Sequence, residues 1–503
     1  MAGFRVKYRT GGLVAAERST KAQVQAYLYG VRRVEHAVLS GASFRRNLHS
    51  PRPGLSVTVG AVLAAIVLAG FAVYGFVKPA PSIGDAKVLV DSDGGGAFVM
   101  RDGTAYPAMN LASAMLAATG EPGRDQGAAV RKVTTSTLAG VPKGQLLGIP
   151  GAPNQVPTKD RLVPDTWTVC DLLTRDPDAV PGHVVSPVTT VLVGLPPART
   201  AADPSVALLV TADGSTYYLV WGGHRARVDL GDRAVVEGLG LDRAAARRVS
   251  VGFLDTVPEG KPIARPAIPG AGEPARLGDR AVRVGDVVAV TRASGGSTRY
   301  LVLGDGVEEV PATVADIVRA STSTSADVRV VALSDISGAP VSASPVDISA
   351  YPAEPLHLVP PDQAPGVCLG WRSGGEPAWT VYPVARVPLP TGAKAVPAPP
   401  LPPSGVQDGT GGADAVYLAP GKGLVLSQSI DGRGGNGGAL VLVNDQGVRY
   451  PVVSAEALAA LGLADTAQPA PAELISLLPL GPTLDPVPAR RFLGGQDGLP
   501  AAG

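Results

Sequence analysis

The chain is poor in the side chains that bind metals and build catalytic sites. Among its 503 residues are two cysteines and five histidines. A zinc site needs three or four such ligands at short, defined spacings, whereas the histidines are scattered, at His36, His49, His183, His224 and His357. The patterns G-x-S-x-G, H-E-x-x-H and the EF-hand loop are also missing. We therefore expect no catalytic residue, no cofactor and no metal centre.

Two glycine-rich stretches resemble phosphate-binding loops but lack the context that such loops need. Gly432–Gly437 matches G-x-G-x-x-G, yet it lies between two expected strands and not between a strand and a helix. The stretch 421–423, Gly-Lys-Gly, lacks the Ser or Thr that follows the lysine of a phosphate loop. Asp91, Asp93 and Asp102 lie close to glycines, where aspartate usually forms turns. An enzyme is therefore the least favoured class of function.

Charged and aromatic residues are scarce as well, at 17% and 5% of the chain. The formal net charge of +1 hides an asymmetry, because residues 1–54 hold ten Lys or Arg against two Glu, and the remainder is acidic. Since the basic surplus is confined to this short segment, the sequence predicts no nucleic-acid partner.

One long uncharged run organises the chain. Leu55–Val77 has 23 residues without a charge, enclosed by Arg52 and Lys78. A helix of that length covers about 34 Å, and a hydrocarbon core is about 30 Å thick. Because 54 residues precede the run and no convincing A-x-A site follows, we expect an uncleaved membrane anchor and not a signal peptide. Positive charge stays in the cytoplasm, so we expect a cytoplasmic N-terminus and an extracytoplasmic segment over residues 78–503.

Before this run, an amphipathic helix is expected over residues 20–39, with Ser19 and Thr20 as cap candidates and Gly41 as its end. Its apolar residues recur at steps of three and four and form one stripe. A lone helix cannot form a core, so the stripe must contact lipid or a partner protein, and we favour the protein. The residues expected at this contact are Val24, Tyr27, Leu28, Val31, Arg32, Arg33, Glu35 and Val38.

Beyond residue 78 one order of elements recurs four times. Each time an apolar strand, a glycine turn, a second strand, a short turn, a short strand and a small helix follow one another. Four occurrences in one order are not easily chance. The first strands are expected at Lys87–Val90, Val206–Val210, Val287–Val290 and Val416–Leu418, and the helices at Leu111–Ala117, Ala234–Leu239, Val314–Arg319 and Ser454–Leu461.

The two cysteines lie in the longer proline-rich stretches between these repeats. Cys170 lies three residues after Trp167, and Cys368 lies three residues before Trp371. This similarity suggests a central body of two related halves. Because the outer region is exported, the cysteines predict one disulfide that closes a loop of about 200 residues, with two free thiols as the alternative.

These patterns predict an α+β protein in the plasma membrane, with an elongated outer domain of β-rich core and four small α/β repeats in a pseudo-two-fold arrangement. The expected domains are a cytoplasmic segment (1–54), the membrane helix (55–77), repeat 1 (78–120), a first core segment (121–200), repeat 2 (201–250), repeat 3 (251–325), a second core segment (326–410), repeat 4 (411–465) and a core-associated C-terminal segment and tail (466–503).

The N-terminal helix resembles the signature of a known family. Its segments Ala22–Tyr27 and Val31–Ala37, the latter with R-R-x-E-H-A, are similar to those of EccB, the single-pass membrane subunit of the actinobacterial type VII (ESX) secretion system. Leu146–Pro153, the two cysteines and Leu477–Leu484 match further. The resemblance covers nearly the whole chain, although Ser40–Gly54 lacks the acidic Asp-Pro type of sequence that the family has there.

The resemblance implies a structural subunit of the secretion machine in the inner membrane. Its partners would be the FtsK/SpoIIIE-like ATPase EccC, the multi-span EccD, EccE and other EccB copies, with the mycosin protease joining outside the membrane. The outer domain would have a disulfide-containing core and four repeats resembling phage-lysin wall-binding modules. ATP hydrolysis has been credited to some members, but no phosphate loop supports it in this sequence.

Two functions from different classes follow. The first is a scaffold that links membrane partners to an outer assembly around the export path. The alternative is an anchor whose repeats bind peptidoglycan, and an ATP-hydrolysing subunit ranks third. A carbohydrate site needs exposed aromatic rings beside polar groups. The candidates are Tyr106, Tyr217, Tyr218, Trp221, Tyr300 and Tyr450, although such alternating strand residues more often belong to a core.

Overall fold

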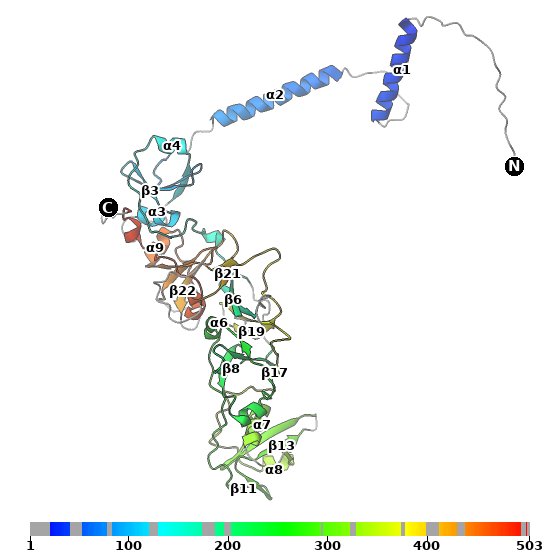
Figure 1. Cartoon of the computed structure of the whole chain (residues 1–503), viewed down its shortest axis with the longest axis vertical. Helices are drawn as coiled ribbons and strands as arrows, with labels where there is room; N and C mark the ends of the chain where they lie inside the picture. Colours follow the sequence, from blue (N-terminus) through cyan, green and yellow to red (C-terminus); the bar gives the residue numbers. More distant parts are fainter. Residues whose placement is uncertain are drawn as a thin grey trace, which may run out of the picture. The chain divides into compact units, whose positions relative to one another are not determined.

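The structure, a computed structural model, describes residues 21–40, 53–77, 83–119, 129–173, 187–195, 203–292, 295–321, 328–373, 378–398, 412–429, 438–493 and 499 (Figure 1). Internal contacts divide the chain into two units, Met1–Pro79 and Ala80–Gly503. The described portion of the first unit is helical, and the second unit contains all the strands that the structure describes. The fold class is therefore mixed α and β, as the sequence predicts.

The first unit has two described helices, α1 at Lys21–Ser40 and α2 at Pro53–Val77. Both lie within two residues of the ranges that the sequence predicts. The window Val57–Tyr74 of α2 is long and apolar enough to cross a membrane, and none of it is buried within the protein. Only lipid or another apolar surface can cover a helix that is apolar on all sides. Outside the described residues lie the cap candidates Ser19, Thr20 and Gly41.

A six-stranded sheet forms the centre of the second unit, in the order β19-β18-β5-β6-β21-β20. The neighbours β5 and β18 are antiparallel, and each is also paired antiparallel with the strand that follows it in sequence, β6 or β19. The bounds are β5 Thr166–Leu173, β6 Pro187–Val193, β18 Gly366–Arg372, β19 Ala378–Val384, β20 Val396–Pro397 and β21 Ala415–Tyr417.

Four smaller sheets of the second unit share one topology. We name them module 1 (residues 88–144), module 2 (206–260), module 3 (287–342) and module 4 (424–481). In each, three successive strands are antiparallel neighbours, and a fourth strand runs parallel to the first. A helix connects the third strand to the fourth, and a short helix follows the fourth strand. In module 2, β17 (His357–Leu358) adds a further parallel partner to the first strand.

The bounds of these elements are as follows. Module 1 comprises β1 Val88–Asp91, β2 Ala97–Arg101, β3 Thr104–Ala108, α3 Leu111–Ala118, β4 Val130–Val133 and α4 Thr135–Ala139. Module 2 comprises β7 Val206–Thr211, β8 Tyr217–Trp221, β9 His224–Val228, α5 Arg233–Gly238, β10 Arg247–Arg248 and α6 Val251–Thr256. Module 3 comprises β13 Val287–Thr291, β14 Ser297–Leu303, β15 Gly306–Val310, α7 Ala312–Ser321, β16 Arg329–Val330 and α8 Leu333–Ser337. Module 4 comprises β22 Leu424–Ser429, β23 Leu440–Val443, β24 Arg449–Val452, α9 Ala455–Ala460, β25 Gln468–Pro471 and α10 Ala472–Ser476. The other elements are η1 Lys159–Arg161, β11 Pro274–Leu277, β12 Arg280–Arg283 and α11 Pro486–Ala489.

A proline-containing segment closes the free edge of the third strand in every module. After the short helix the chain returns along that strand, and the strand donates a backbone hydrogen bond to a proline carbonyl. The donors and acceptors are Ala105 to Pro142, Arg225 to Pro258, Val307 to Pro340 and Arg449 to Pro479. The residue two positions after each proline donates back to the strand, from Gly144, Gly260, Ser342 and Gly481. Pairing the edge in this way removes a surface that could otherwise join another sheet.

The structure corrects two expectations for the repeats. The strand expected over 416–418 as the start of repeat 4 lies instead in the central sheet, because β21 pairs with β6, and β22 takes its place. The repeat ends expected at residues 120, 325 and 465 leave out both the fourth strand and the short helix after it. The end expected at residue 250 leaves out the short helix alone. The closing strands β10 and β16 have two residues each, too few to show a periodic pattern.

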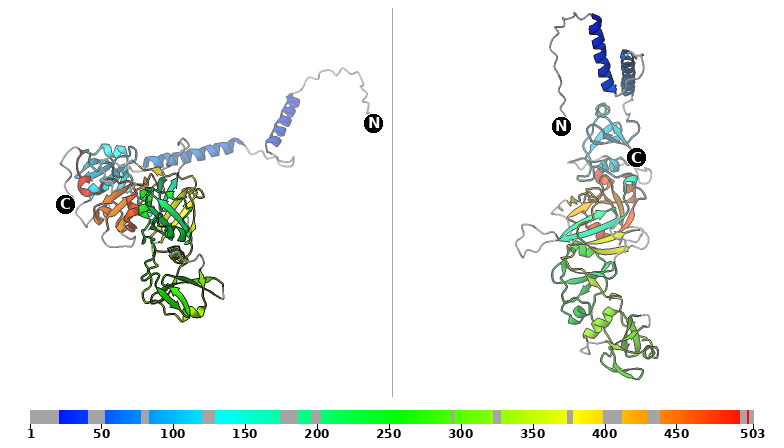
Figure 2. Two further views of the ribbon diagram at one scale, coloured as in Figure 1. Left: turned by 60° about the horizontal axis from the view of Figure 1, so that its bottom comes forward. Right: turned by 90° about the vertical axis from the view of Figure 1, so that its right-hand side faces the viewer.

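Modules 2 and 4 pack on the central sheet, whereas modules 1 and 3 pack on other modules. One buried cluster unites Trp167 and Trp371 of the central sheet with Phe253 of module 2 and Leu474 of module 4. A second cluster joins α3 of module 1 to α9 of module 4, and α7 of module 3 contacts α5 of module 2. The order of contact is therefore module 1, module 4, central sheet, module 2 and module 3, which differs from the order along the chain (Figure 2).

The third residue of the short last helix distinguishes the modules that pack on the central sheet. In modules 2 and 4 it is Phe253 or Leu474, and both are fully buried in the central cluster. In modules 1 and 3 it is Thr137 or Asp335. A buried Phe or Leu side chain stabilises by about 1.5–3 kcal/mol relative to an exposed one, whereas a polar side chain there would lose its water. This position therefore favours docking of modules 2 and 4 alone.

The contact between α5 and α7 is close enough to require glycine at position 238. A Cβ at Gly238 would lie 2.6 Å from the backbone nitrogen of Ile317. We expect Gly238→Ala to push the helices apart and to cost about 1–3 kcal/mol of stability, seen as a lower midpoint in thermal unfolding of the full chain. Gly304→Ala is the matched control, because a Cβ there meets nothing within 4 Å. Equal midpoints for the two variants would contradict a tight contact.

Candidate functional site

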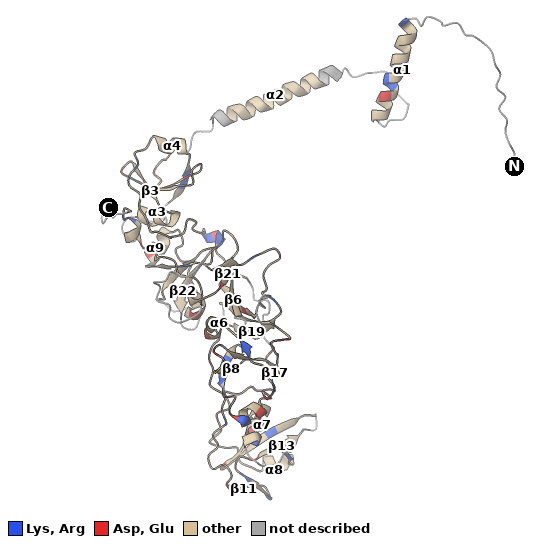
Figure 3. Ribbon diagram, in the orientation of Figure 1, with Lys and Arg blue, Asp and Glu red and all other residues tan. Residues whose placement is uncertain are grey.

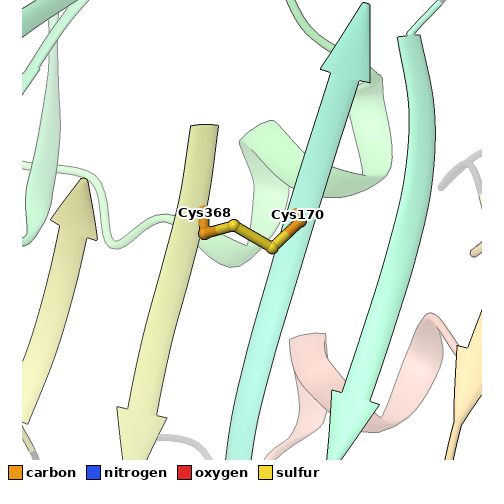
Figure 4. Close-up of a disulfide and its surroundings, with 2 residues drawn as sticks. All are labelled: Cys170 and Cys368. Carbon is orange, nitrogen blue, oxygen red and sulfur yellow. A yellow bond between two sulfur atoms is a disulfide. The ribbon is translucent and has the colours of Figure 1, made fainter. Parts of the chain in front are cut away.

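The two cysteines meet in the centre of the six-stranded sheet. Cys170 of β5 lies directly opposite Cys368 of β18, and the two form a disulfide that links residues 198 positions apart (Figure 4). Both side chains are fully buried. The predicted disulfide is therefore confirmed. It covalently joins β5 to β18.

The same register places two tryptophans opposite each other. Trp167 of β5 pairs with Trp371 of β18, three residues from the cysteines. Because successive side chains alternate between the faces of a sheet, the disulfide lies on one face and the indole rings on the other. Both tryptophans are fully buried, and the rings of Trp371 and Trp379 lie 6.1 Å apart. The tryptophan face is the one that modules 2 and 4 cover.

A buried carboxyl lies at the start of β5. Asp165 is 1% exposed, and its Oδ1 accepts a hydrogen bond of 2.5 Å from the indole Nε1–H of Trp167. Its backbone N–H donates to Oε1 of Gln468 in module 4 at 3.1 Å, while Oδ2 has no partner. Burial raises the pKa of Asp165 to about 7, although the hydrogen bond from Trp167 opposes the shift. Sequence reasoning missed this residue, and its position two residues before a tryptophan was its only signal.

Two buried polar contacts join module 2 to the central body. The Asp171 carboxylate accepts from the backbone N–H of Ser250 at 2.5 Å and from its hydroxyl at 3.2 Å, and Ser250 in turn caps α6. Burial raises the pKa of Asp171, and the hydrogen bond from Ser250 lowers it. The guanidinium of Arg247 donates to the carbonyl of Ala364. Burial lowers the pKa of Arg247 to about 10.

The residues expected at a partner contact all lie on α1, and they are exposed within the described structure. Val24, Val31 and Val38 are 46%, 45% and 77% exposed, and Tyr27 is 73% exposed. Arginines and a glutamate also lie on this helix (Figure 3). Nothing in the described structure therefore covers the apolar stripe of α1.

Of the two stretches that resemble phosphate loops, the described one at 421–423 does not form such a loop. At 421–423 the N–H of Gly421 donates to the Asp445 carboxylate at 2.8 Å, and the N–H of Gly423 donates to the carbonyl of Arg161 at 3.2 Å. A strand, β22, and not a helix follows. Gly432–Gly437 lies outside the described residues.

Two of the acidic residues near glycines, Asp91 and Asp102, serve contacts and turns within module 1. Asp91 accepts from the Thr135 hydroxyl at 2.8 Å, and this hydrogen bond lowers the pKa of Asp91. Asp102 has a φ of 49° in the turn between β2 and β3. Among the described residues no group of three His, Cys, Asp or Glu could hold a metal ion.

Most of the aromatic candidates for carbohydrate binding are engaged in packing. Tyr106 stacks on Phe492 with ring centroids 6.0 Å apart, and Arg225 lies 5.2 Å above the ring of Tyr218. Trp221 and Tyr450 are 8% and 4% exposed. The strands of the modules therefore present no row of open aromatic rings among the described residues, although Tyr450 lines a cavity.

Residues 16–500 match a family model described as type VII secretion system ESX-1, transport TM domain B. Among curated proteins, the chain is 32% identical over 486 residues to "ESX-2 secretion system ATPase EccB2" of Mycobacterium tuberculosis, with 93% of each chain covered. It is 33% identical over 508 residues to "ESX-1 secretion system ATPase EccB1" of the same organism, covering 96% of this chain and 99% of that protein.

Two solved structures show the same likeness. A chain of an intact ESX-5 inner membrane complex matches with a TM-score of 0.66 and 29% identity, covering 97% of this chain and 98% of the other. The EccB3 dimer from the ESX-3 core complex matches with a TM-score of 0.65 and 29% identity, covering 80% of this chain and 99% of the other.

Loss of the disulfide is expected to destabilise the second unit. The double variant Cys170→Ser/Cys368→Ser should lose about 2–5 kcal/mol, because a long loop is no longer closed in the unfolded chain. Denaturant unfolding of the full chain, with and without reductant, measures this. Reductant should shift the wild-type curve toward that of the variant and leave the variant unchanged. A wild-type unfolding midpoint that is the same with and without reductant would contradict the prediction.

Asp165 is expected to make stability depend on pH. Its pKa of about 7 in the folded chain lies above the ordinary value of 3.8, so the unfolded chain releases the proton first as pH rises. Stability therefore falls between about pH 4 and pH 7, by an amount on the order of 4 kcal/mol. Asp165→Asn keeps an oxygen for the Trp167 indole and should raise the thermal midpoint at pH 8 but hardly at pH 4.

The control for this measurement is Asp362→Asn, which changes an exposed aspartate. It should leave the midpoint unchanged at both pH values. Equal shifts at pH 4 and pH 8 in the Asp165 variant would show that its carboxyl does not titrate between them.

Proposed function

Because this chain belongs to the EccB family of type VII secretion systems, we propose that it links partners at the inner membrane to an outer assembly around the export path. It is a structural component of such a secretion complex. The observation that carries the proposal is one helix long and apolar enough to span a membrane, α2, which connects an exposed amphipathic helix to a disulfide-linked unit.

The proposed orientation places α1 in the cytoplasm and residues 78–503 outside. It is supported by the ten basic residues before α2 and by the disulfide, which persists in oxidising compartments. The N-terminal segment would then meet the ATPase subunit EccC and the membrane subunits EccD and EccE. The outer unit would meet other copies of the chain and the mycosin protease.

The outer unit is proposed to consist of four repeats in a pseudo-two-fold arrangement around β5 and β18. The shared strand order and the four equivalent proline bridges support the repeats, and the paired cysteines and tryptophans support the symmetry. With the corrected boundaries, the repeats are modules 1 to 4. Copies of the chain would assemble through this unit, since a relative is solved as a dimer.

We propose a scaffold and not an ATPase, although relatives carry that word in their names. The glycine-lysine stretch at 421–423 uses its backbone N–H groups within the fold and leads into a strand. Phosphate loops instead point free N–H groups at the ligand from the start of a helix. A wall anchor built on the aromatic residues of the strands has less support, because most of those rings are packed.

The stripe on α1 provides a test. We expect Val31→Asp to place a charge in an apolar contact and to reduce the yield of EccC, EccD and EccE homologues that co-purify with the tagged chain by about tenfold or more. The measurement is purification from native membranes in mild detergent, followed by quantitative mass spectrometry.

The matched control is Gln25→Asp, which adds the same charge on another face of α1. It should leave the complex intact. A Val31→Asp chain that still co-purifies at wild-type yield would refute the role of the stripe and leave the family membership untouched.

A further inference from the structure

A cavity of about 640 Å³ lies where four segments far apart in the sequence meet. These segments are the loop after module 1, the edge strand β20, the end of β21 and the turn between β23 and β24. The volume falls within the range of small-ligand sites, about 300–1,000 Å³. Polar side chains of the lining include Asn154, Gln155, Lys394, Tyr417, Gln446 and Tyr450.

Two other polar side chains hold one wall of the cavity in place. Oδ1 of Asn444 accepts from the backbone N–H groups of Gln446 and Val448, at 3.2 and 3.0 Å. The carboxylate of Asp445 accepts from the N–H of Gly421 at 2.8 Å. These bonds fix the turn between β23 and β24 against the segment before β22. A ligand would therefore meet a wall that is already ordered, which lowers the entropic cost of binding.

The remaining polar groups of the lining are uncommitted. Within the residues that the structure describes, the side-chain amides of Asn154, Gln155 and Gln446 have no hydrogen-bond partner, nor do the hydroxyls of Tyr417 and Tyr450. Tyr450 is 4% exposed. Its hydroxyl oxygen is not among the buried polar atoms that lack a partner, so this oxygen is accessible at the cavity. The cavity is where water or a ligand can supply that partner.

This lining fits a sugar better than an ion. Amides and phenol hydroxyls both donate and accept, as sugar hydroxyls do. The rings of Tyr417 and Tyr450, together with Pro153 and Pro420, offer apolar surface to the C–H face of a sugar ring. Among the lining residues Lys394 carries the only positive charge, and the one carboxylate, Asp445, is engaged.

We propose that this cavity binds a neutral oligosaccharide of a few sugar units. None of the residues named for the α1 contact lines it, so the site and the scaffold role can fail separately. The test uses the full chain in lipid nanodiscs, because detergents with sugar headgroups would compete. The probes are the trimer of N-acetylglucosamine and maltotriose, titrated by calorimetry. We expect saturable binding of at least one probe, weakened about tenfold by Tyr450→Phe, which removes one hydrogen bond.

Tyr106→Phe is the matched control. Tyr106 occupies the same position in module 1, one residue after the strand residue that bonds the closing segment, and it is not among the residues that line the cavity. This variant should bind as the wild type does, whereas Asn154→Ala/Gln155→Ala should abolish binding. Both changed residues are exposed, so the double variant should fold.

Three results would overturn the proposal. The first is no binding of either trisaccharide at millimolar concentration, and the second is equal binding by the wild type and Tyr450→Phe. The third is a loss in Lys394→Ala larger than that in Tyr450→Phe, since binding would then depend on the lysine and not on the neutral amides and hydroxyls of the lining.

Discussion

The antiparallel pairing of β5 with β18 is the interaction on which the second unit depends. It places two cysteines opposite each other on one face and two tryptophans opposite each other on the other face. A shift of one residue in this register would exchange the faces of every side chain on one strand. The disulfide excludes such a shift, and the tryptophan face can then receive modules 2 and 4. The positions of modules 1 and 3 follow, because each packs on one of those two.

The four modules share one backbone topology, but modules 2 and 4 pack on the central sheet and modules 1 and 3 do not. Single side chains distinguish the two pairs. Phe253 and Leu474 are buried against the central sheet, whereas the corresponding positions of modules 1 and 3 hold the polar residues Thr137 and Asp335. The arginine in the fourth strand, Arg247 in module 2, also differs in burial between the modules. It is buried in module 2 against the carbonyl of Ala364, while its counterparts in modules 1 and 3, Arg131 and Arg329, remain partly exposed or exposed.

The sequence predicted the features that extend over many residues or depend on rare residue types. The uncharged run of α2, the amphipathic pattern of α1 and the pairing of two lone cysteines are of this kind. Short elements were not predicted, because the two residues of β10 or β16 are too few to show the alternation of apolar and polar residues that is typical of a strand. The strand β25 was not predicted because it contains two prolines, and the run at 416–418 was assigned to module 4 because apolar strands look alike without their partners. The role of Asp165 could not be predicted, because it depends on burial and on a contact with Gln468, 303 positions away in the sequence.

The contact between module 1 and the C-terminal segment bears on how the protein matures. The buried cluster shared by modules 1 and 4 includes Leu484, Ala489 and Leu499, and Arg490 donates to the carbonyl of Thr119 at 2.7 Å. Module 1 is the first of the four modules along the chain, yet the cluster that it shares with module 4 is complete only when residues 484–499 have been made. Contacts between such distant residues form slowly, and an incomplete chain exposes apolar surface in the meantime. The apolar residues of module 1 in this cluster therefore stay partly uncovered until residues 484–499 have been made.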